Sequence, residues 1–302
     1  MPLPTLKRNK ISTHFQLFNA KLPVILIALL LFAMSSILCM ATAHANDKAT
    51  RVLFVGNSLT YVANLPAVFD ALSLNNRHPF VSDMLAQGGA TLTERVQDKS
   101  VEQALASQAY SYVILQERGG DFLCAFGPQS CEDANASLKH LVNLARQYHV
   151  TPIFLGSYQV HPGASISIVE AEQKAATNAA VAYIPVSAKL QIALQVAPKL
   201  AWLNQDKAHP GHDLALLQAA MLYIEITRQT IDATDLTVYA PMYKPNTRIA
   251  PIIINSTGDG TSSDVYVYSA QVLSTIVAIT NQSALTEVSH DLSHRLTAIW
   301  GQ

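Results

Sequence analysis

The chain has 302 residues, half of them hydrophobic, with 20 basic and 21 acidic side chains and a net charge of −1 at pH 7. Residues 1–45 hold four of the basic residues and none of the acidic ones, so the remainder carries 16 basic against 21 acidic side chains, a net charge of −5. This acidic balance argues against nucleic acid as a partner. The roughly 257 residues that follow position 45 are enough for one large domain with its own core.

The N-terminus has the pattern of an export signal. Basic residues occur within residues 1–21, an almost continuous apolar run follows over residues 22–40, and small residues flank the end of the signal at Ala43-His44-Ala45. This order is typical of a secretory signal peptide, so residues 1–45 are expected to be removed near Ala45 to leave a periplasmic or secreted protein. The alternative is an uncleaved membrane anchor, because the apolar run is nearly long enough to span a bilayer. The membrane would then be contacted only through this segment.

The next part of the chain alternates short apolar runs with longer segments of helical periodicity. The runs typical of buried strands are 52–55, 80–85, 112–115, 152–155 and 182–186. Apolar residues recur at helical spacing around 65–74, 92–108, 134–148 and 168–180, and a further helix is predicted over 214–226. This alternation predicts an α/β fold, a three-layer α/β/α domain of flavodoxin-like arrangement with a mainly parallel five-stranded sheet.

Residues 236–302 are less regular. Several prolines and the turn at 258–260 precede apolar-periodic segments near 269–279 and 285–299. We expect this part to be a C-terminal extension packed on the main domain. No internal repeat or long low-complexity linker separates the two parts.

Two cysteines remain after residue 45, Cys124 and Cys131. In an oxidising compartment we expect them to form a disulfide that closes a small surface loop. A metal site is the competing interpretation, but no histidine lies close to them in the sequence. His290 and His294 have the i, i+4 spacing of a helical metal pair, yet they lie opposite the apolar face of segment 285–299, which favours a solvated helix surface. No metal site is therefore predicted.

A serine follows the first predicted strand, in the tetrapeptide Gly-Asn-Ser-Leu that ends at residue 59. Serine is a poor nucleophile until a neighbouring base removes its proton during attack. Far downstream, Asp206 precedes His209 by three residues; a histidine can act as the base, and a carboxylate can hold its ring in the required tautomer. Read alone, the serine block is a common turn, and the Asp-x-x-His block would fix a turn and cap a helix. Their ordered combination, with the glycine pair 88–89 between them, favours a hydrolase site.

These blocks resemble those of the SGNH, or GDSL, hydrolases. Residues 56–59 resemble the first block, 88–91 the glycine block that supplies an oxyanion-hole amide, and 206–211 the terminal block that carries the other two triad members. The blocks occur in the family's order, within about residues 51–228. The third block departs from the common pattern: many members have Gly-x-Asn-Asp, whereas this chain has Leu-Gln116-Glu. This is similar to a divergent branch with a Gly-Asn-Ser first block and glutamine in the third.

The resemblance implies an SGNH-hydrolase-like catalytic domain over residues 46–235. It implies Ser58 as nucleophile, His209 as general base and Asp206 as the carboxylate that orients His209. The oxyanion would be held by the backbone amides of Ser58 and Gly89 and by the side chain of Gln116. No metal or organic cofactor is required. The implied activity is that of a carboxylic ester hydrolase acting through an acyl-serine on a small-molecule or glycan ester, and we favour a small acyl group, such as acetyl on a carbohydrate.

Two alternatives remain open. A glycan-binding module with the SGNH fold and little or no activity is favoured by the missing Asn-Asp pair and disfavoured by the complete Ser, His and Asp set. Acyl transfer to a sugar hydroxyl would use the same acyl-serine. A second histidine triplet begins at His161, but Tyr158 instead of an acid lies three residues before it, so a loop role is predicted there.

Overall fold

The structure is a computed structural model that describes residues 49–258 and 264–282. These residues belong to one compact unit, which begins at Ala49. The predicted export signal and segment 285–299, with His290 and His294, lie outside the described residues. Within the described ranges, no helix combines the length and apolar character needed to cross a membrane.

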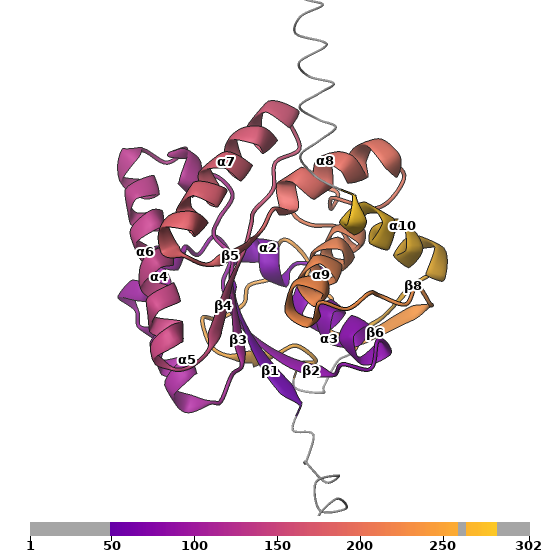
Figure 1. Cartoon of the computed structure of the whole chain (residues 1–302), viewed down its shortest axis with the longest axis horizontal. Coiled ribbons are helices and arrows are strands. Elements are labelled where there is room, and N and C mark those ends of the chain that lie inside the picture. Colours follow the sequence, from indigo (N-terminus) through magenta and orange to yellow (C-terminus); the bar gives the residue numbers. More distant parts are fainter. Residues whose placement is uncertain (1–48, 259–263, 283–302) are drawn as a thin grey trace, which may run out of the picture. The chain divides into compact units, whose positions relative to one another are not determined.

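A mainly parallel sheet lies between two layers of helices, which confirms the predicted fold class (Figure 1). Its parallel strands are β1 (Thr50–Gly56), β2 (Phe80–Ala86), β3 (Tyr112–Leu115), β4 (Thr151–Leu155) and β5 (Ala182–Ile184). Their order in the sheet is β5-β4-β3-β1-β2, and the short strand β7 (Ile254–Asn255) adds an antiparallel sixth strand beside β2. The chain leaves β1 for β2 on one side and later returns to β3 on the other. In sheets of this kind, ligands bind at the carboxyl ends of the strands, at the point where the order reverses.

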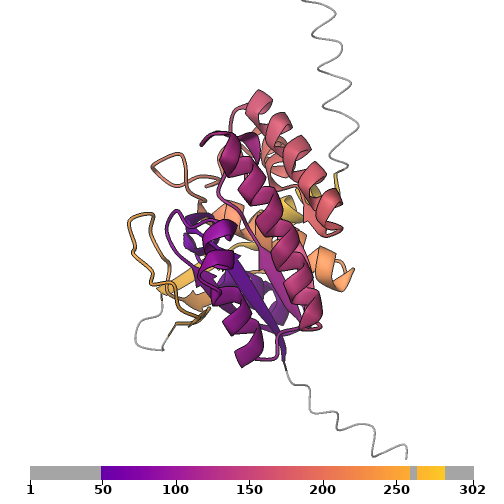
Figure 2. The same cartoon turned by 90° about the vertical axis from the view of Figure 1, so that its left-hand side faces the viewer.

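Alternate residues of the buried strands face the two helical layers. Val52 and Phe54 of β1 belong to one hydrophobic cluster, and Leu53 and Val55 to the other. The second cluster is covered by α4 (Leu92–Gln97), α5 (Ser100–Ser107), α6 (Pro128–Gln147) and α7 (Pro162–Ala179), the layer that faces the viewer in Figure 2. The first is covered by α3 (Leu65–Asn75), α8 (Val186–Val196), α9 (His212–Thr227) and α10 (Ala270–Asn281). Because β1 is buried continuously from Val52 to Gly56 and its apolar side chains point alternately to the two clusters, both faces of the sheet have to be covered by helices.

Among the helices that cover the sheet, two regions differ from the sequence prediction. The single helix expected over 92–108 is divided into α4 and α5, because Lys99 adopts a left-handed backbone conformation with φ of 57°. Asp98 stabilises the break, since its Oδ1 accepts from Ser100 N at 2.9 Å. The second difference is α8, which was not predicted. The strand expected over 182–186 ends at Ile184, and after Pro185 the helix begins at Val186, a residue that the sequence pattern assigned to the strand.

The C-terminal part contributes a second, two-stranded antiparallel sheet of β6 (Leu236–Ala240) and β8 (Asp264–Tyr268), followed by α10. Strand β6 lies against α3, and α10 lies against α8 and α9. The buried Lys189 of α8 donates through Nζ to the carbonyls of Ile279, at 3.2 Å, Thr280, at 2.9 Å, and Gln282. A lysine at this position satisfies carbonyl groups that the end of a helix leaves without intrahelical partners. The division of the chain at residue 235 stays a prediction.

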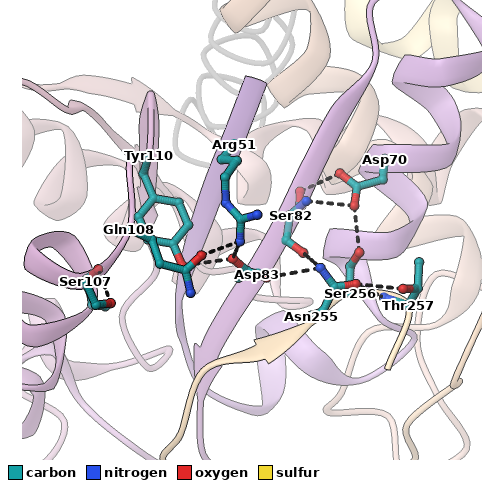
Figure 3. Close-up of polar contacts among 11 residues, drawn as sticks. Arg51, Asp70, Ser82, Asp83, Ser107, Gln108, Tyr110, Asn255, Ser256 and Thr257 are labelled. Carbon is teal, nitrogen blue, oxygen red and sulfur yellow. Dashed lines mark hydrogen bonds and ion pairs between the residues drawn. The ribbon is translucent and has the colours of Figure 1, made fainter. Parts of the chain in front are cut away.

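Buried polar side chains attach β7 to the sheet (Figure 3). Asp83 of β2 is buried; it accepts from Tyr110 Oη at 2.9 Å and from Asn255 Nδ2 at 3.1 Å, and it pairs with Arg51 of β1. Because a buried carboxylate must be paired to be tolerated, these contacts tie three distant segments together. They explain how a strand of two residues is held at the edge of the sheet.

Asp70, on α3, makes the second set of contacts in Figure 3 and carries a testable pH dependence. It accepts from Ser82 N and Oγ at 2.9 and 2.5 Å and from Ser256 Oγ at 2.6 Å, while burial raises its pKa from 3.8 to about 6. The folded protein therefore holds this proton more tightly than the unfolded chain. The free energy of unfolding should increase as the pH falls from about 6 to about 4, and this gain should be lost as the pH rises through 6.

Asp70→Asn should remove this part of the pH dependence, which is on the order of 3 kcal/mol. With its oxygen in the place of Oδ2, the asparagine still accepts from Ser82 N and Ser256 Oγ, and its amide group can donate to the Ser82 hydroxyl. Urea unfolding between about pH 4 and pH 7 measures the effect. Glu132→Gln, at an exposed position of α6, is the control and should behave as the wild type. A wild-type slope in Asp70→Asn would contradict the assignment.

Candidate active site

Ser58 lies directly after β1, at the carboxyl edge of the sheet where the strand order reverses. It is the first residue of α2 (Ser58–Tyr61), and Asn57 caps this helix by accepting from Leu59 N at 3.0 Å. The strand and the helix approach each other closely at Gly56, where a Cβ would lie 2.1 Å from Thr60 Oγ1. The glycine two residues before the serine is therefore required by the sharp strand-to-helix turn.

Asp206 and His209 lie on a loop that closes on itself before α9. Gly211 N donates to Trp202 O, and Asn204 N donates to His209 O, each at 2.9 Å. His209 is thereby held at the base of the loop, and Asp206 lies at the tip. We call residues 202–211 the histidine loop.

Asp206 both shapes the histidine loop and contacts the imidazole. Its Oδ1 accepts from the backbone amides of Ala208 and His209, each at 3.0 Å, and its Oδ2 lies 2.6 Å from His209 Nδ1. The backbone hydrogen bond from His209 is the largest cause that lowers the pKa of Asp206, to about 2, so the carboxylate is ionised at neutral pH. On the other side of the ring, His209 Nε2 lies 3.0 Å from Ser58 Oγ. With the ring proton on Nδ1, Nε2 can accept the serine proton.

The structure thus brings Ser58, His209 and Asp206 into one continuous chain of hydrogen bonds. The serine and the histidine are 151 residues apart in the sequence. Fold topology explains their meeting, because the serine follows the central strand and the histidine loop leads into a helix packed on the same sheet.

The glycine pair forms a turn next to Asn57, the residue that precedes Ser58. Ala90 N donates to Gln87 O at 3.1 Å, and Gly89, the third residue of this turn, has a φ of 74°, which favours glycine. Asn57 Nδ2 donates to Ala90 O at 3.2 Å. The residue that precedes the predicted nucleophile therefore also holds the loop that carries the predicted oxyanion amide of Gly89.

Gln116, the third predicted oxyanion donor, is buried and already engaged. Its Oε1 accepts from Thr60 Oγ1 at 2.7 Å, and its Nε2 donates to Gly156 O at 3.4 Å. Gln116 thus joins the end of β3 to α2, the helix that begins at Ser58. The amide group of Gln116 has two N–H hydrogens, and the bond to Gly156 uses one of them. The other can donate to a second acceptor, such as the predicted oxyanion.

Glu117 is a buried acid that the sequence did not identify as part of the site. Its Oε2 accepts from Leu92 N at 3.0 Å and its Oε1 accepts from Arg118 N at 2.8 Å. Burial raises the pKa of Glu117 to about 8. This carboxyl group holds the start of α4, immediately after the glycine turn. The sequence feature that could have identified Glu117 was its position next to Gln116 in the Leu-Gln-Glu block.

Tyr158 is a second residue that sequence reasoning did not assign. It is buried after β4, and its Oη donates to Ala208 O, in the histidine loop, at 2.8 Å. Burial raises the pKa of Tyr158, so the hydroxyl keeps the proton that it donates. Asp206, Lys207 and Ala208 are exposed at the tip of this loop, and the tyrosine anchors them to the body of the domain.

The structure also describes two further predicted features, the disulfide and His161. Cys124 and Cys131 form the predicted disulfide, with a Cα–Cα distance of 4.8 Å, and it joins the loop after β3 to the first turn of α6. His161 is exposed at the start of α7. Among the residues placed by the structure, no three His, Cys, Asp or Glu side chains cluster closely enough to hold a metal ion.

Comparisons with known proteins show a shared fold. No family model matches the chain, and no curated protein sequence matches it. A DUF4886 family protein from Bacteroides uniformis is 18% identical, with a TM-score of 0.50 over 61% of this chain and 85% of that chain. The two chains have the same fold. A candidate SGNH hydrolase from Slackia heliotrinireducens is 24% identical, with a TM-score of 0.48 over 58% of this chain and 97% of that chain.

A third solved structure is that of a variant acetyl xylan esterase from Geobacillus stearothermophilus. It is 14% identical, with a TM-score of 0.49 over 60% of this chain and 96% of that chain. At such identities a likeness concerns the arrangement of the elements, so the chemistry has to be argued from the side chains of the site.

Proposed function

We propose that this protein is an exported serine ester hydrolase of the SGNH type. The observation that carries the proposal is the pair of hydrogen bonds, 2.6 and 3.0 Å long, that links Asp206 to His209 and His209 to Ser58. A nucleophile within reach of a base, with the base oriented by a third group, is the arrangement that activates serine. The position of Ser58 at the switch point of the sheet supports the same conclusion.

The geometry supports a two-step reaction. Ser58 Oγ attacks the ester carbonyl carbon while His209 Nε2 takes its proton, and the carbonyl π electrons move to the oxygen. When the tetrahedral intermediate collapses, the bond to the alcohol breaks and His209 returns the proton to the departing alkoxide, which leaves an acyl-Ser58. Water then attacks this ester with His209 as base, releasing the acid and restoring the serine. The ionised Asp206 stabilises the imidazolium in both steps.

The oxyanion would be stabilised by the amides of Ser58 and Gly89, with Gln116 as third donor. Removing one such donor typically raises the barrier by about 2.7 to 4 kcal/mol. Asn57 and Glu117 support this role because they hold the backbone that follows Gly89. Asn57 donates to the carbonyl of Ala90, and Glu117 accepts from the amide of Leu92. Hydrogen-bonding side chains of this kind keep the amide donors in place before the charge develops.

The substrate is proposed to be a small acyl ester, with acetyl on a carbohydrate as the favoured case. Residues 1–45 would direct the protein to the periplasm or the exterior, by cleavage near Ala45 or with the segment retained as an anchor. The disulfide between Cys124 and Cys131 supports an oxidising compartment.

The test compares hydrolysis of p-nitrophenyl acetate by the wild type, Ser58→Ala and His209→Ala. Both variants should lose at least about 10⁴-fold in kcat, because the two residues act as a unit. A fluorophosphonate probe should label the wild type and not Ser58→Ala, and circular dichroism verifies that each protein is folded. Unchanged activity in Ser58→Ala would reject the nucleophile assignment. A folded wild type with neither turnover nor labelling would favour the glycan-binding module instead.

Tyr158→Phe should lower kcat about tenfold while KM changes little. The substitution removes a single hydroxyl, and the loss of one hydrogen bond to Ala208 loosens the loop that aligns His209. Tyr110→Phe is the matched control, since it also removes a buried tyrosine hydroxyl bond, but to Asp83 on β2. The control should lose stability and keep its kcat. Equal kcat values in Tyr158→Phe and the wild type would mean that the loop is held adequately by its own backbone bonds.

A further inference from the structure

The side chain of Gln116 is held at both ends by segments that lie far from it in the sequence. Its Oε1 accepts from Thr60 Oγ1 at 2.7 Å, and its Nε2 donates to Gly156 O at 3.4 Å. Thr60 and Gln116 are each 1% exposed, so solvent does not compete for these contacts. The two hydrogen bonds therefore decide how the carboxamide is oriented.

The chemistry of the two partners settles which end of the carboxamide faces which. A backbone carbonyl can only accept, so Gly156 O has to face the amide nitrogen and the oxygen of Gln116 has to face Thr60. A hydroxyl can donate or accept, and in this arrangement it must donate. One N–H of Gln116 is used by Gly156 O, and the plane of the carboxamide then fixes the direction of the other.

Thr60 is fixed relative to Ser58. Both residues belong to α2, and Thr60 N donates to Asn57 O at 3.0 Å. The glycine before this helix leaves the space in which the hydroxyl lies, because a Cβ on Gly56 would be 2.1 Å from Thr60 Oγ1. The group that orients Gln116 is therefore built into the same turn as the proposed nucleophile.

The carbonyl of Gly156, the second partner of Gln116, belongs to a peptide group that is itself held on both sides. Ser157 N, in the same peptide group, donates to Glu172 Oε1 at 2.9 Å. Glu172 is buried on α7, and its Oε2 accepts from Tyr183 Oη at 2.8 Å. This buried acid has no part in the proposed reaction steps, and its contacts keep the carbonyl of Gly156 in place. The carboxamide thus lies between two fixed points.

The orientation matters because an oxyanion donor contributes fully only if it points at the developing charge beforehand. A glutamine has three rotatable side-chain bonds, so much conformational freedom has to be removed before its amide is fixed. Without the hydroxyl of Thr60, Oε1 of Gln116 would be buried without a donor, which is costly. The carboxamide would then turn to find another partner, and its second N–H would lose its direction.

We propose that Thr60 is a positioning residue that aims the second N–H of Gln116 at the oxyanion of the tetrahedral intermediate. The inference rests on the proposed esterase function, and it adds a residue that neither the triad nor the predicted oxyanion donors include. Ser58 and Thr60 then act from one helix. The serine supplies the attacking oxygen, and the threonine orients a group that stabilises the charge created by the attack.

The test is a double-mutant cycle on the full chain with p-nitrophenyl acetate as substrate. Gln116→Ala should lower kcat about 10²-fold, as expected for the loss of one oxyanion donor. Thr60→Val, which replaces the hydroxyl by a methyl group of similar size, should lower kcat at least about tenfold with little change in KM. In the double variant kcat should lie within about twofold of Gln116→Ala, because Thr60 acts through the glutamine.

Two further variants separate orientation from stability. Thr60→Ser keeps the hydroxyl and should retain kcat within about threefold of the wild type. Ser73→Ala removes another buried hydroxyl bond, to Asp70 O on α3, and should lower the melting temperature without changing kcat. If circular dichroism shows that Thr60→Val does not fold, Thr60→Ala, which also lacks the hydroxyl, takes its place in the cycle.

The outcomes separate this proposal from the one on which it rests. Wild-type kcat in Thr60→Val would overturn the role of Thr60 and leave the esterase intact. Losses that multiply in the double variant would also overturn it, since the two residues would then act independently. Unchanged kcat in Gln116→Ala would have the same consequence, because there would be no donor to position. A folded wild type without turnover would instead reject the esterase, and this inference with it.

Discussion

Asp206→Asn is expected to lower kcat/KM for ester hydrolysis by about 10⁴-fold while the protein stays folded. The asparagine Oδ1 can still accept from the amides of Ala208 and His209, so the tip of the loop is preserved. The new amide group, however, directs a donor at His209 Nδ1. That donor favours the tautomer with the proton on Nε2, which cannot accept from Ser58 Oγ. Steady-state kinetics and a thermal melt measure the two effects separately.

Lys207→Asn is the control for this variant. Lys207 neighbours Asp206 at the exposed tip of the loop and has a φ of 59°, a conformation that asparagine tolerates. The control removes a charge from the loop without touching the imidazole, and its kcat/KM should stay within about twofold of the wild type. If folded Asp206→Asn retained a kcat/KM within tenfold of the wild type, the role of the carboxylate in orienting His209 would be wrong.

Gly211→Ala is expected to reduce both stability and activity. A Cβ at Gly211 would lie 2.1 Å from Ala201 O and 3.0 Å from Leu203 O. Both are backbone atoms at the base of the histidine loop, so neither can rotate away as a flexible side chain would. The start of α9 has to move, which should lower the free energy of unfolding by about 3 kcal/mol. A displacement of His209 by about 1 Å should lower kcat by about 10²-fold.

The matched control is Gly163→Ala, in the first turn of α7. A Cβ there would meet only the side chain of His161, at 3.3 Å or more, and alanine is the better helix former. Its unfolding midpoint should be unchanged or higher, with wild-type kcat. Urea unfolding measures the stability of both variants, and steady-state kinetics measures their kcat. A Gly211→Ala protein of wild-type stability and activity would refute the steric argument.

The parts of the site that could be predicted from the sequence are those whose residues lie close together in the chain or follow a recognisable strand. Asp206 and His209 are close in the chain, and the same carboxylate that turns the loop also bonds the ring. Ser58 could be placed because it follows a recognisable buried strand, and the parallel topology directs the ends of such strands to one edge. The five parallel strands were predictable for the same reason, since each is a short apolar run with turn residues nearby.

The parts that could not be predicted depend on contacts between distant segments. Tyr158 reaches the histidine loop 50 residues further along the chain, and Glu117 holds a helix that starts 25 residues before it. Gln116 was predicted as an oxyanion donor, but only the structure shows that its carboxamide is bonded to Thr60 and Gly156. Nothing in the local pattern around these residues encodes their partners.

The sequence by itself determined the layered α/β class and the alternation of strands and helices along the chain. It also identified a serine, a histidine and an acid suited to nucleophilic chemistry. These follow from hydrophobic periodicity and from residue types at short spacing, which are properties of the chain alone. The tertiary structure decided which distant residues hold these groups in place, as the hydrogen bond from Tyr158 to Ala208 in the histidine loop does. Residues 242–246 lie beside Asp206 only because Tyr243 O accepts a hydrogen bond from Ala63 N, just after the helix that contains Ser58. Such long-range pairing depends on the packing of the whole domain.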